Sequence, residues 1–141
     1  MNIAVLRESR ASFEFKWAAA HARRYKERNE MKEFPDFMKS PANLIGKKSQ
    51  HTDEIEGYVF NGADGSQMAF WTCYQNRDSK EHTHDFDEYF VVVQGRYTVI
   101  IGKEEKHIEV GQECYIPKGT PHSGRVIAGT RTIHCFGGKR V

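Results

Sequence analysis

The sequence predicts one all-β domain, an antiparallel barrel or sandwich, with a single α-helix before it. From residue 55 onward, short runs rich in β-branched and aromatic residues alternate with Gly- and Pro-containing turns at close intervals. The helical pattern occurs once, before these runs, which argues against a doubly wound α/β fold. The length of 141 residues favours a single domain. A chain of this size can fold without a disulfide or a structural metal.

Residues 10–33 carry the helical pattern. Apolar side chains recur there at roughly helical spacing: Phe13, Trp17, Ala20 and Tyr25. Pro35 cannot continue a helix and disfavours the α conformation of the residue before it, so the helix is expected to end at about residue 33. Residues 34–54 contain two prolines and no clear period; long ordered connections often serve as lids, which is one interpretation of this segment. We expect residues 1–54 to pack, as helix and connecting loop, on a barrel formed by residues 55–141.

The β pattern consists of eight runs separated by turn residues. In order, the expected strands are 55–60, 67–75, 87–94, 96–101, 106–110, 113–116, 122–127 and 130–136. The sequence NGADGS at 61–66 joins the first two as a hairpin with a longer loop. Glycine or proline occurs in several of the later connections, as expected for an antiparallel barrel.

Composition narrows the classes of partner. The formal charge of +2 gives no basis for nucleic acid or an acidic membrane as a partner. No apolar run reaches the roughly 18 residues of a membrane span, and the N-terminal stretch lacks the features of a signal peptide. The cysteines are odd in number and show no C-x-x-C spacing: Cys73, Cys114 and Cys135. We therefore expect no disulfide framework, a cytoplasmic location, and cysteines that mostly serve as small core residues, with a thiol near a metal as the alternative.

A candidate metal site begins at His82. In an extended chain, residues two apart point to the same face, so His82 and His84 can direct two imidazoles toward one ion. Glu88 lies four residues further on and has matching parity if the chain stays extended. An H-x-H pair alone is weak evidence, because surface histidine pairs occur by chance.

A second motif strengthens the case. It has the form G-x(5)-P-x-G-x(2)-H and consists of Gly111, Pro117, Gly119 and His122. The first motif has the form H-x-H-x(3)-E-x(6)-G and ends at Gly95. Together the two motifs resemble those of the cupin superfamily, small double-sheet jelly rolls that include many metalloenzymes. The resemblance implies a double-stranded β-helix, that is, a jelly-roll cupin barrel, with His82, His84, Glu88 and His122 as ligands of one divalent metal ion.

Two positions depart from the family pattern. Asn76 stands where the family has a glycine six residues before the first histidine, and Val126 stands where the second motif closes on asparagine. In the family both positions shape turns or supporting hydrogen bonds, so the departures concern the surroundings of the site and not the ligands.

The implied ligand set limits the metal. Three imidazoles and one carboxylate suit Fe, Mn, Co, Ni, Cu or Zn and are too rich in nitrogen for Ca or Mg. In octahedral geometry four protein ligands leave two positions open for substrate, water or O₂. A closed tetrahedral zinc site would instead be catalytically inert.

Two further expectations concern the barrel walls. If Glu88 faces inward, Tyr89, Val91 and Val93 face outward as an apolar row, which requires either the N-terminal helix or a second subunit as a cover. Cupins are often dimers, so we predict a homodimer. His134, on the last strand, is either a partner of the metal ligands or an acid–base group near the metal, with an exposed position as the alternative. His21, His51 and His107 are expected to be uninvolved.

The functional hypotheses belong to two classes. The first is an enzyme acting on a small organic molecule, with a dioxygenase favoured because the inner wall is expected to be apolar. A Lewis-acid isomerase, epimerase or lyase is the alternative chemistry, and it needs an acid–base group, for which His134 is the candidate. The second class is a binding module that holds a small molecule without turnover.

Overall fold

The computed structural model describes residues 16, 18–20, 22–23, 31–47, 51–52 and 54–141, and the chain divides into two compact units, Met1–Lys32 and Glu33–Val141. In the first unit every described residue from 16 to 23 is helical, in agreement with the predicted helix. Met31 to Glu33 are not helical, so the predicted end at residue 33 is wrong. Pro35 prevents a helix from continuing past this point, but it does not require the helix to extend that far. The rest of the predicted helix, with His21, lies outside the described residues.

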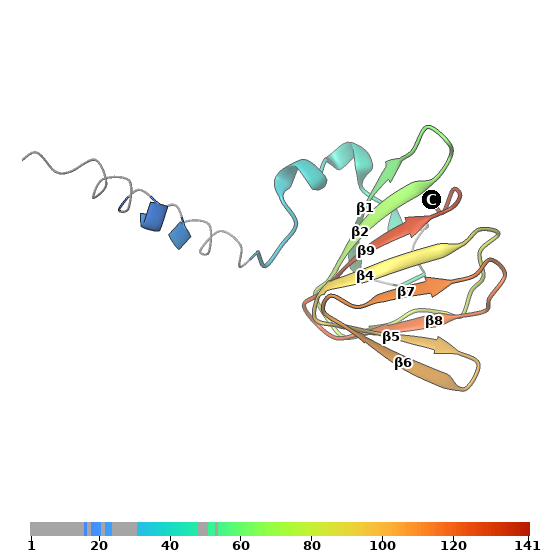
Figure 1. The fold of residues 1–141 in the computed structure, drawn as a ribbon. Coiled ribbons are helices and arrows are strands. Elements are labelled where there is room, and N and C mark those ends of the chain that lie inside the picture. Colours follow the sequence, from blue (N-terminus) through green and yellow to red (C-terminus); the bar gives the residue numbers. More distant parts are fainter. Residues whose placement is uncertain (1–15, 17, 21, 24–30, 48–50, 53) are drawn as a thin grey trace, which may run out of the picture. The chain divides into compact units, whose positions relative to one another are not determined.

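The second unit contains two antiparallel sheets that face each other (Figure 1). Two 3₁₀ turns precede them, η1 (Asp36–Met38) and η2 (Pro41–Asn43). The strands are β1 (Ile55–Asn61), β2 (Gln67–Cys73), β3 (Arg77–Asp78), β4 (Glu88–Gln94), β5 (Arg96–Ile101), β6 (Glu104–Glu109), β7 (Glu113–Ile116), β8 (Ser123–Val126) and β9 (Thr130–Phe136). One sheet has the order β1-β2-β9-β4-β7 and the other β3-β8-β5-β6. This interleaving of distant strands confirms the predicted jelly-roll fold and adds β3, which was not predicted.

The core lies between the sheets. Along β4 the side chains of Glu88, Phe90 and Val92 are buried, whereas the alternate residues are exposed or half-buried, as the predicted parity requires. One cluster of buried apolar residues contains Phe90, Val92, Val99, Ile108, Cys114 and Ile116. Burial of each large side chain contributes about 1.5–3 kcal/mol to folding. Glu88 is the charged residue among these inward-facing side chains, and a buried carboxylate needs hydrogen bonds or an opposite charge to offset its loss of water.

The segment before β1 crosses the edge of the larger sheet. Phe34 packs edge-on against Phe70 on the outer face, with ring centroids 5.6 Å apart. Further on, the amide of Ile45 donates to the carbonyl of Gly57 at 2.8 Å, and its side chain joins Ala69 and Trp71 on the inner face. Further along the chain, His51 and Thr52 line a cavity in the barrel.

The apolar side chains on the outer face of β4 are the basis for predicting a homodimer. Tyr89 is 37% exposed, and Val91 and Val93 are half-buried in the single chain. We expect light scattering at micromolar concentration to give twice the chain mass of 16.3 kDa, because a second subunit would bury this row. A monomeric mass would contradict the dimer and leave the N-terminal helix as the candidate cover.

No helix in the described part of the chain is both long and apolar enough to cross a membrane.

Candidate metal centre and its cavity

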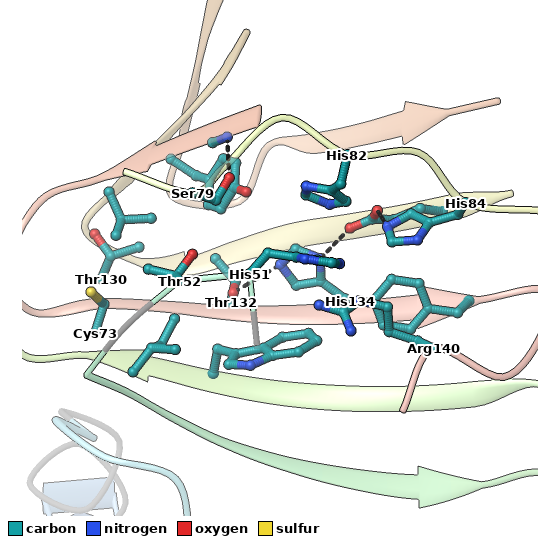
Figure 2. A pocket seen from close by; sticks show the side chains of 17 residues that line it. His51, Thr52, Cys73, Ser79, His82, His84, Thr130, Thr132, His134 and Arg140 are labelled. Carbon is teal, nitrogen blue, oxygen red and sulfur yellow. Dashed lines mark hydrogen bonds and ion pairs between the residues drawn. The ribbon is translucent and has the colours of Figure 1, made fainter. Parts of the chain in front are cut away.

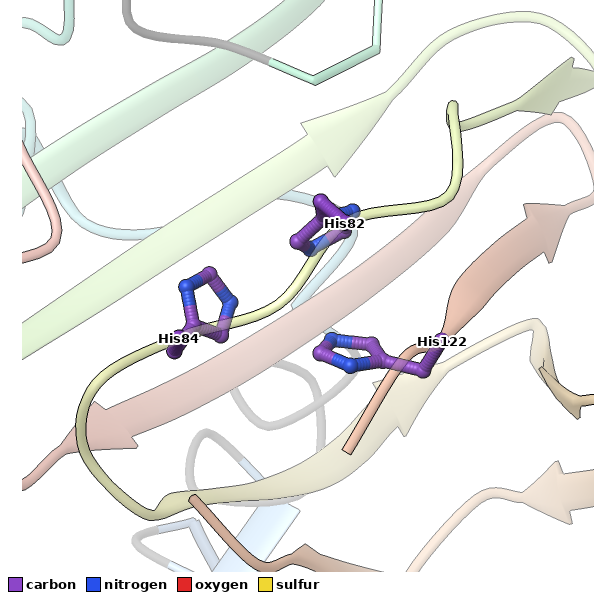
Figure 3. Close-up of side chains that lie close together, drawn as sticks. All are labelled: His82, His84 and His122. Atoms are coloured by element: carbon purple, nitrogen blue, oxygen red, sulfur yellow. The ribbon is translucent and has the colours of Figure 1, made fainter. Parts of the chain in front are cut away.

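Three histidines from two distant loops converge at one end of the barrel (Figure 3). His82 and His84 lie between β3 and β4, and His122 lies immediately before β8. The backbones of His82 and His122 pair with each other as an isolated bridge, with N–H···O distances of 2.9 and 3.0 Å. One potential ligand atom of each of the three residues lies within 4.8 Å of the others. The three histidines can therefore hold a single metal ion.

The turn of the second motif fixes this approach. The amide of Gly119 donates to the carbonyl of His84 at 2.9 Å. Gly119 has φ of +76°, a left-handed conformation that glycine adopts without a steric penalty. The turn thus binds the loop of the first motif directly, which explains the spacing from Gly119 to His122.

Backbone carbonyls orient two of the imidazoles. Nδ1 of His82 lies 2.8 Å from the carbonyl oxygen of Lys80, and Nδ1 of His122 lies 2.8 Å from that of Thr120. Because a carbonyl only accepts hydrogen bonds, each Nδ1 carries the proton and donates. The lone pair then resides on Nε2, the form in which an imidazole binds a metal.

Glu88 brings a carboxylate to the histidines. Its Oε2 lies 3.2 Å from Nε2 of His84 and 3.3 Å from Nε2 of His122. Burial by itself would raise the pKa of this carboxyl, but its contacts with His122, His134 and His84 outweigh burial and hold the pKa well below its usual value. Glu88 is therefore an ionised carboxylate in the interior.

Two polar atoms at the centre lack hydrogen-bond partners. Oε2 of Glu88 and Nε2 of His84 are buried and make no hydrogen bond, although they face each other. Buried atoms of this kind carry a substantial desolvation cost unless a partner is supplied. A cation held between them would satisfy both, and imidazole nitrogen with carboxylate oxygen is a donor set suited to transition metals. The residues present therefore fit a metal ion.

His134 is buried beside Glu88, so the exposed alternative is wrong. Its Nδ1 lies 2.7 Å from Oε1 of Glu88, and its Nε2 lies 3.0 Å from Oγ1 of Thr132. The ring stacks on Phe90 with centroids 4.7 Å apart. Both nitrogens are thus engaged, and His134 holds the carboxylate oxygen that points away from the other histidines.

A cavity of about 60 Å³ adjoins these residues (Figure 2). Apolar walls are formed by Ile55, Trp71, Val126 and Phe136. Hydroxyl groups lie among them, including those of Thr130 and Thr132, and the thiol of Cys73 also lines the cavity. Burial raises the pKa of the Cys73 thiol, which therefore stays protonated. All three cysteines are free, as predicted.

Among the residues that line the cavity, the sequence analysis did not identify the ionisable side chains of His51 and Arg140. His51 was expected to be uninvolved, but its ring stacks on that of His82 with centroids 3.9 Å apart. Burial, together with the positive charge of Arg140, lowers the pKa of His51 to about 4. No motif surrounds either residue, so no local signal in the sequence marks them.

The two departures from the family pattern are both accommodated. Oδ1 of Asn76 accepts a hydrogen bond from the amide of Ala128 at 2.8 Å and so ties two loops together. Val126 is 6% exposed and packs as an apolar residue on β8. Neither position contributes a ligand atom.

Comparison with known proteins agrees with the geometry. A family model described as "Cupin domain" matches residues 70–136. A search of curated proteins gave no match.

Solved structures with the same fold come from several bacteria. A cupin superfamily protein from Desulfitobacterium hafniense is 10% identical, with a TM-score of 0.55 over 60% of this chain and 77% of that one. The polyketide cyclase RemF from Streptomyces resistomycificus is 16% identical, with a TM-score of 0.56 over 69% and 75%. KdgF from Halomonas sp. is 18% identical, with a TM-score of 0.53 over 60% and 80%. The chain therefore contains a cupin domain, within residues 70–136, and its barrel has the jelly-roll fold of that superfamily.

Proposed function

We propose that the protein is a metal-dependent enzyme that oxidises a small organic molecule with O₂. The main support is the cluster of three histidines and one carboxylate beside a cavity: His82, His84, His122 and Glu88. Within it, Nε2 of His84 and Oε2 of Glu88 are buried and make no hydrogen bond. We assign these four residues as the metal ligands.

The chain's own residues prepare the site. Backbone carbonyls fix the tautomers of His82 and His122, and His134 fixes the orientation of Glu88. A bound Fe, Mn, Co, Ni or Cu ion would supply redox chemistry and open positions for the substrate. Trp71 and Phe136 exclude water on one side of the cavity and provide an apolar surface for the substrate.

The environment of His134 supports oxidation over proton transfer. Isomerase or lyase chemistry needs an acid–base group free to exchange a proton with the substrate. Both ring nitrogens of His134 are within hydrogen-bond distance of protein groups, so His134 is better suited to hold Glu88 than to act on substrate.

His51 favours a second candidate, Lewis-acid isomerase or lyase chemistry. Its half-buried imidazole lines the cavity and could exchange a proton with the substrate. One solved structure of the same fold is a polyketide cyclase, so the fold supports chemistry besides oxidation.

We also expect the protein to work in the cytoplasm, because its three cysteines are unpaired.

Metal analysis tests this proposal first. We expect freshly purified protein to hold about one equivalent of Fe, Mn, Ni or Cu and to consume O₂ in an electrode assay with short-chain carboxylates, diketones or enols. Tightly held zinc without O₂ uptake would contradict the oxidation and favour the second candidate or a binding module. Protein that takes up no transition metal would contradict both enzymatic candidates.

A further inference from the structure

Arg140 lies where the cavity meets the outside. It lines the cavity and also an adjoining groove of about 380 Å³ (Figure 2). The two spaces have three lining residues in common, Arg140, His51 and His84. A molecule that enters the cavity through this groove therefore passes the guanidinium group and one candidate metal ligand.

The position of Arg140 is built into the fold. Oε1 of Gln67 accepts hydrogen bonds from the amides of Arg140 at 2.5 Å and Val141 at 3.1 Å, and Nε2 of Gln67 donates to the carbonyl of Val141 at 3.0 Å. Gln67 itself is 4% exposed on β2. The segment that carries Arg140 is thus bound to the barrel by a buried side chain.

The charge at this place favours an anion. Among the described residues that line the cavity, Glu88 is the carboxylate, and histidines surround it within 2.7–3.3 Å. The groove adds Asp85 and Lys139, whose opposite charges offset each other. A divalent ion beside Glu88 would leave the site with positive charge, to which the guanidinium adds. A guanidinium has five N–H donors and stays positively charged in proteins. Its planar fork matches the two oxygens of a carboxylate.

We propose that Arg140 binds the carboxylate of a short-chain organic acid, whose remaining atoms extend into the cavity toward the histidines. This inference rests on the proposed function and names the substrate class. The size of the cavity agrees: about 60 Å³ is less than half of the roughly 150 Å³ cavity that holds benzene in another protein. A short aliphatic chain therefore suits this volume better than an aromatic ring does.

Butyrate and its neutral analogue butyramide test the inference. Both are titrated by calorimetry into the full-length, zinc-loaded protein, with Trp71 fluorescence as a second readout because this residue lines the cavity. We expect butyrate to bind about tenfold more tightly than butyramide, since a carboxylate gains charge-assisted hydrogen bonds. Arg140→Gln should remove this preference and leave butyramide binding unchanged. Lys103→Gln, which removes an exposed charge away from both the cavity and the groove, should retain it.

Arg140→Lys is a second test variant in case Arg140→Gln does not fold. It keeps the positive charge and should retain part of the preference for butyrate. Equal binding of butyrate and butyramide by the unaltered protein, or an unchanged preference in folded Arg140→Gln, would overturn the inference. Zinc content is measured in the same samples. Full zinc with no preference for butyrate defeats the inference alone. Failure to bind zinc or any other transition metal defeats the proposed function, and the two titrations then still test the role of Arg140.

Discussion

Replacement of His122 by alanine is expected to abolish stoichiometric metal binding while the barrel remains folded. Removal of a partner that only orients a ligand typically costs about 10–100-fold in metal affinity, so loss of a ligand should cost more than about 100-fold. The fold should persist because β8 pairs with β5 and β3 through its backbone, and the bridge between His82 and His122 also uses backbone atoms. Metal content after dialysis and the far-ultraviolet circular dichroism spectrum measure the two effects.

His107→Ala provides the matched control. His107 is exposed on β6, where its Nδ1 lies 2.9 Å from Oγ1 of Thr98, and it does not line the cavity. The variant should keep the metal content of the unaltered protein. Full metal occupancy in His122→Ala would refute the assignment of His122 as a ligand, and loss of metal in both variants would indicate a general effect of histidine removal.

The sequence predicts the barrel well because its signals are local. Alternation along β4 identifies which side chains face inward, and the prediction of Glu88 on the inner face follows directly. The convergence of His82 and His122 could be expected from the resemblance to cupins, which implies that the two motifs supply ligands to one metal ion. The structure adds the physical reason: the turn at Gly119 binds the backbone of His84.

The missed features depend on contacts between distant segments. His51 lines the cavity together with residues far along the chain, and its ring stacks on that of His82. Arg140 is held by Gln67, more than seventy residues earlier in the chain. β3 consists of only Arg77 and Asp78, too short to show a period in the sequence. None of these positions carries a pattern that single-sequence reasoning could detect.

His134→Ala is expected to weaken metal binding about 10–100-fold, the usual effect of removing a group that orients a ligand. Oε1 of Glu88 would lose its hydrogen bond to Nδ1 of His134, 2.7 Å away, and the carboxylate would be free to rotate away from the other histidines. We expect His134→Gln, which retains an N–H donor, to recover part of the affinity. Competition with a chromophoric chelator measures the metal affinity of each variant.

Thr132→Val separates the two hydrogen bonds of His134. It removes the contact with Nε2 and leaves the bond to Glu88 in place, so its affinity for metal should fall less than that of His134→Ala. If His134→Ala bound metal as tightly as the unaltered protein, Glu88 would be oriented without it. His134 would then not be needed to hold Glu88 and would be available to exchange a proton with the substrate. Isomerisation would become the favoured reaction, because the engagement of both ring nitrogens is what favours oxidation.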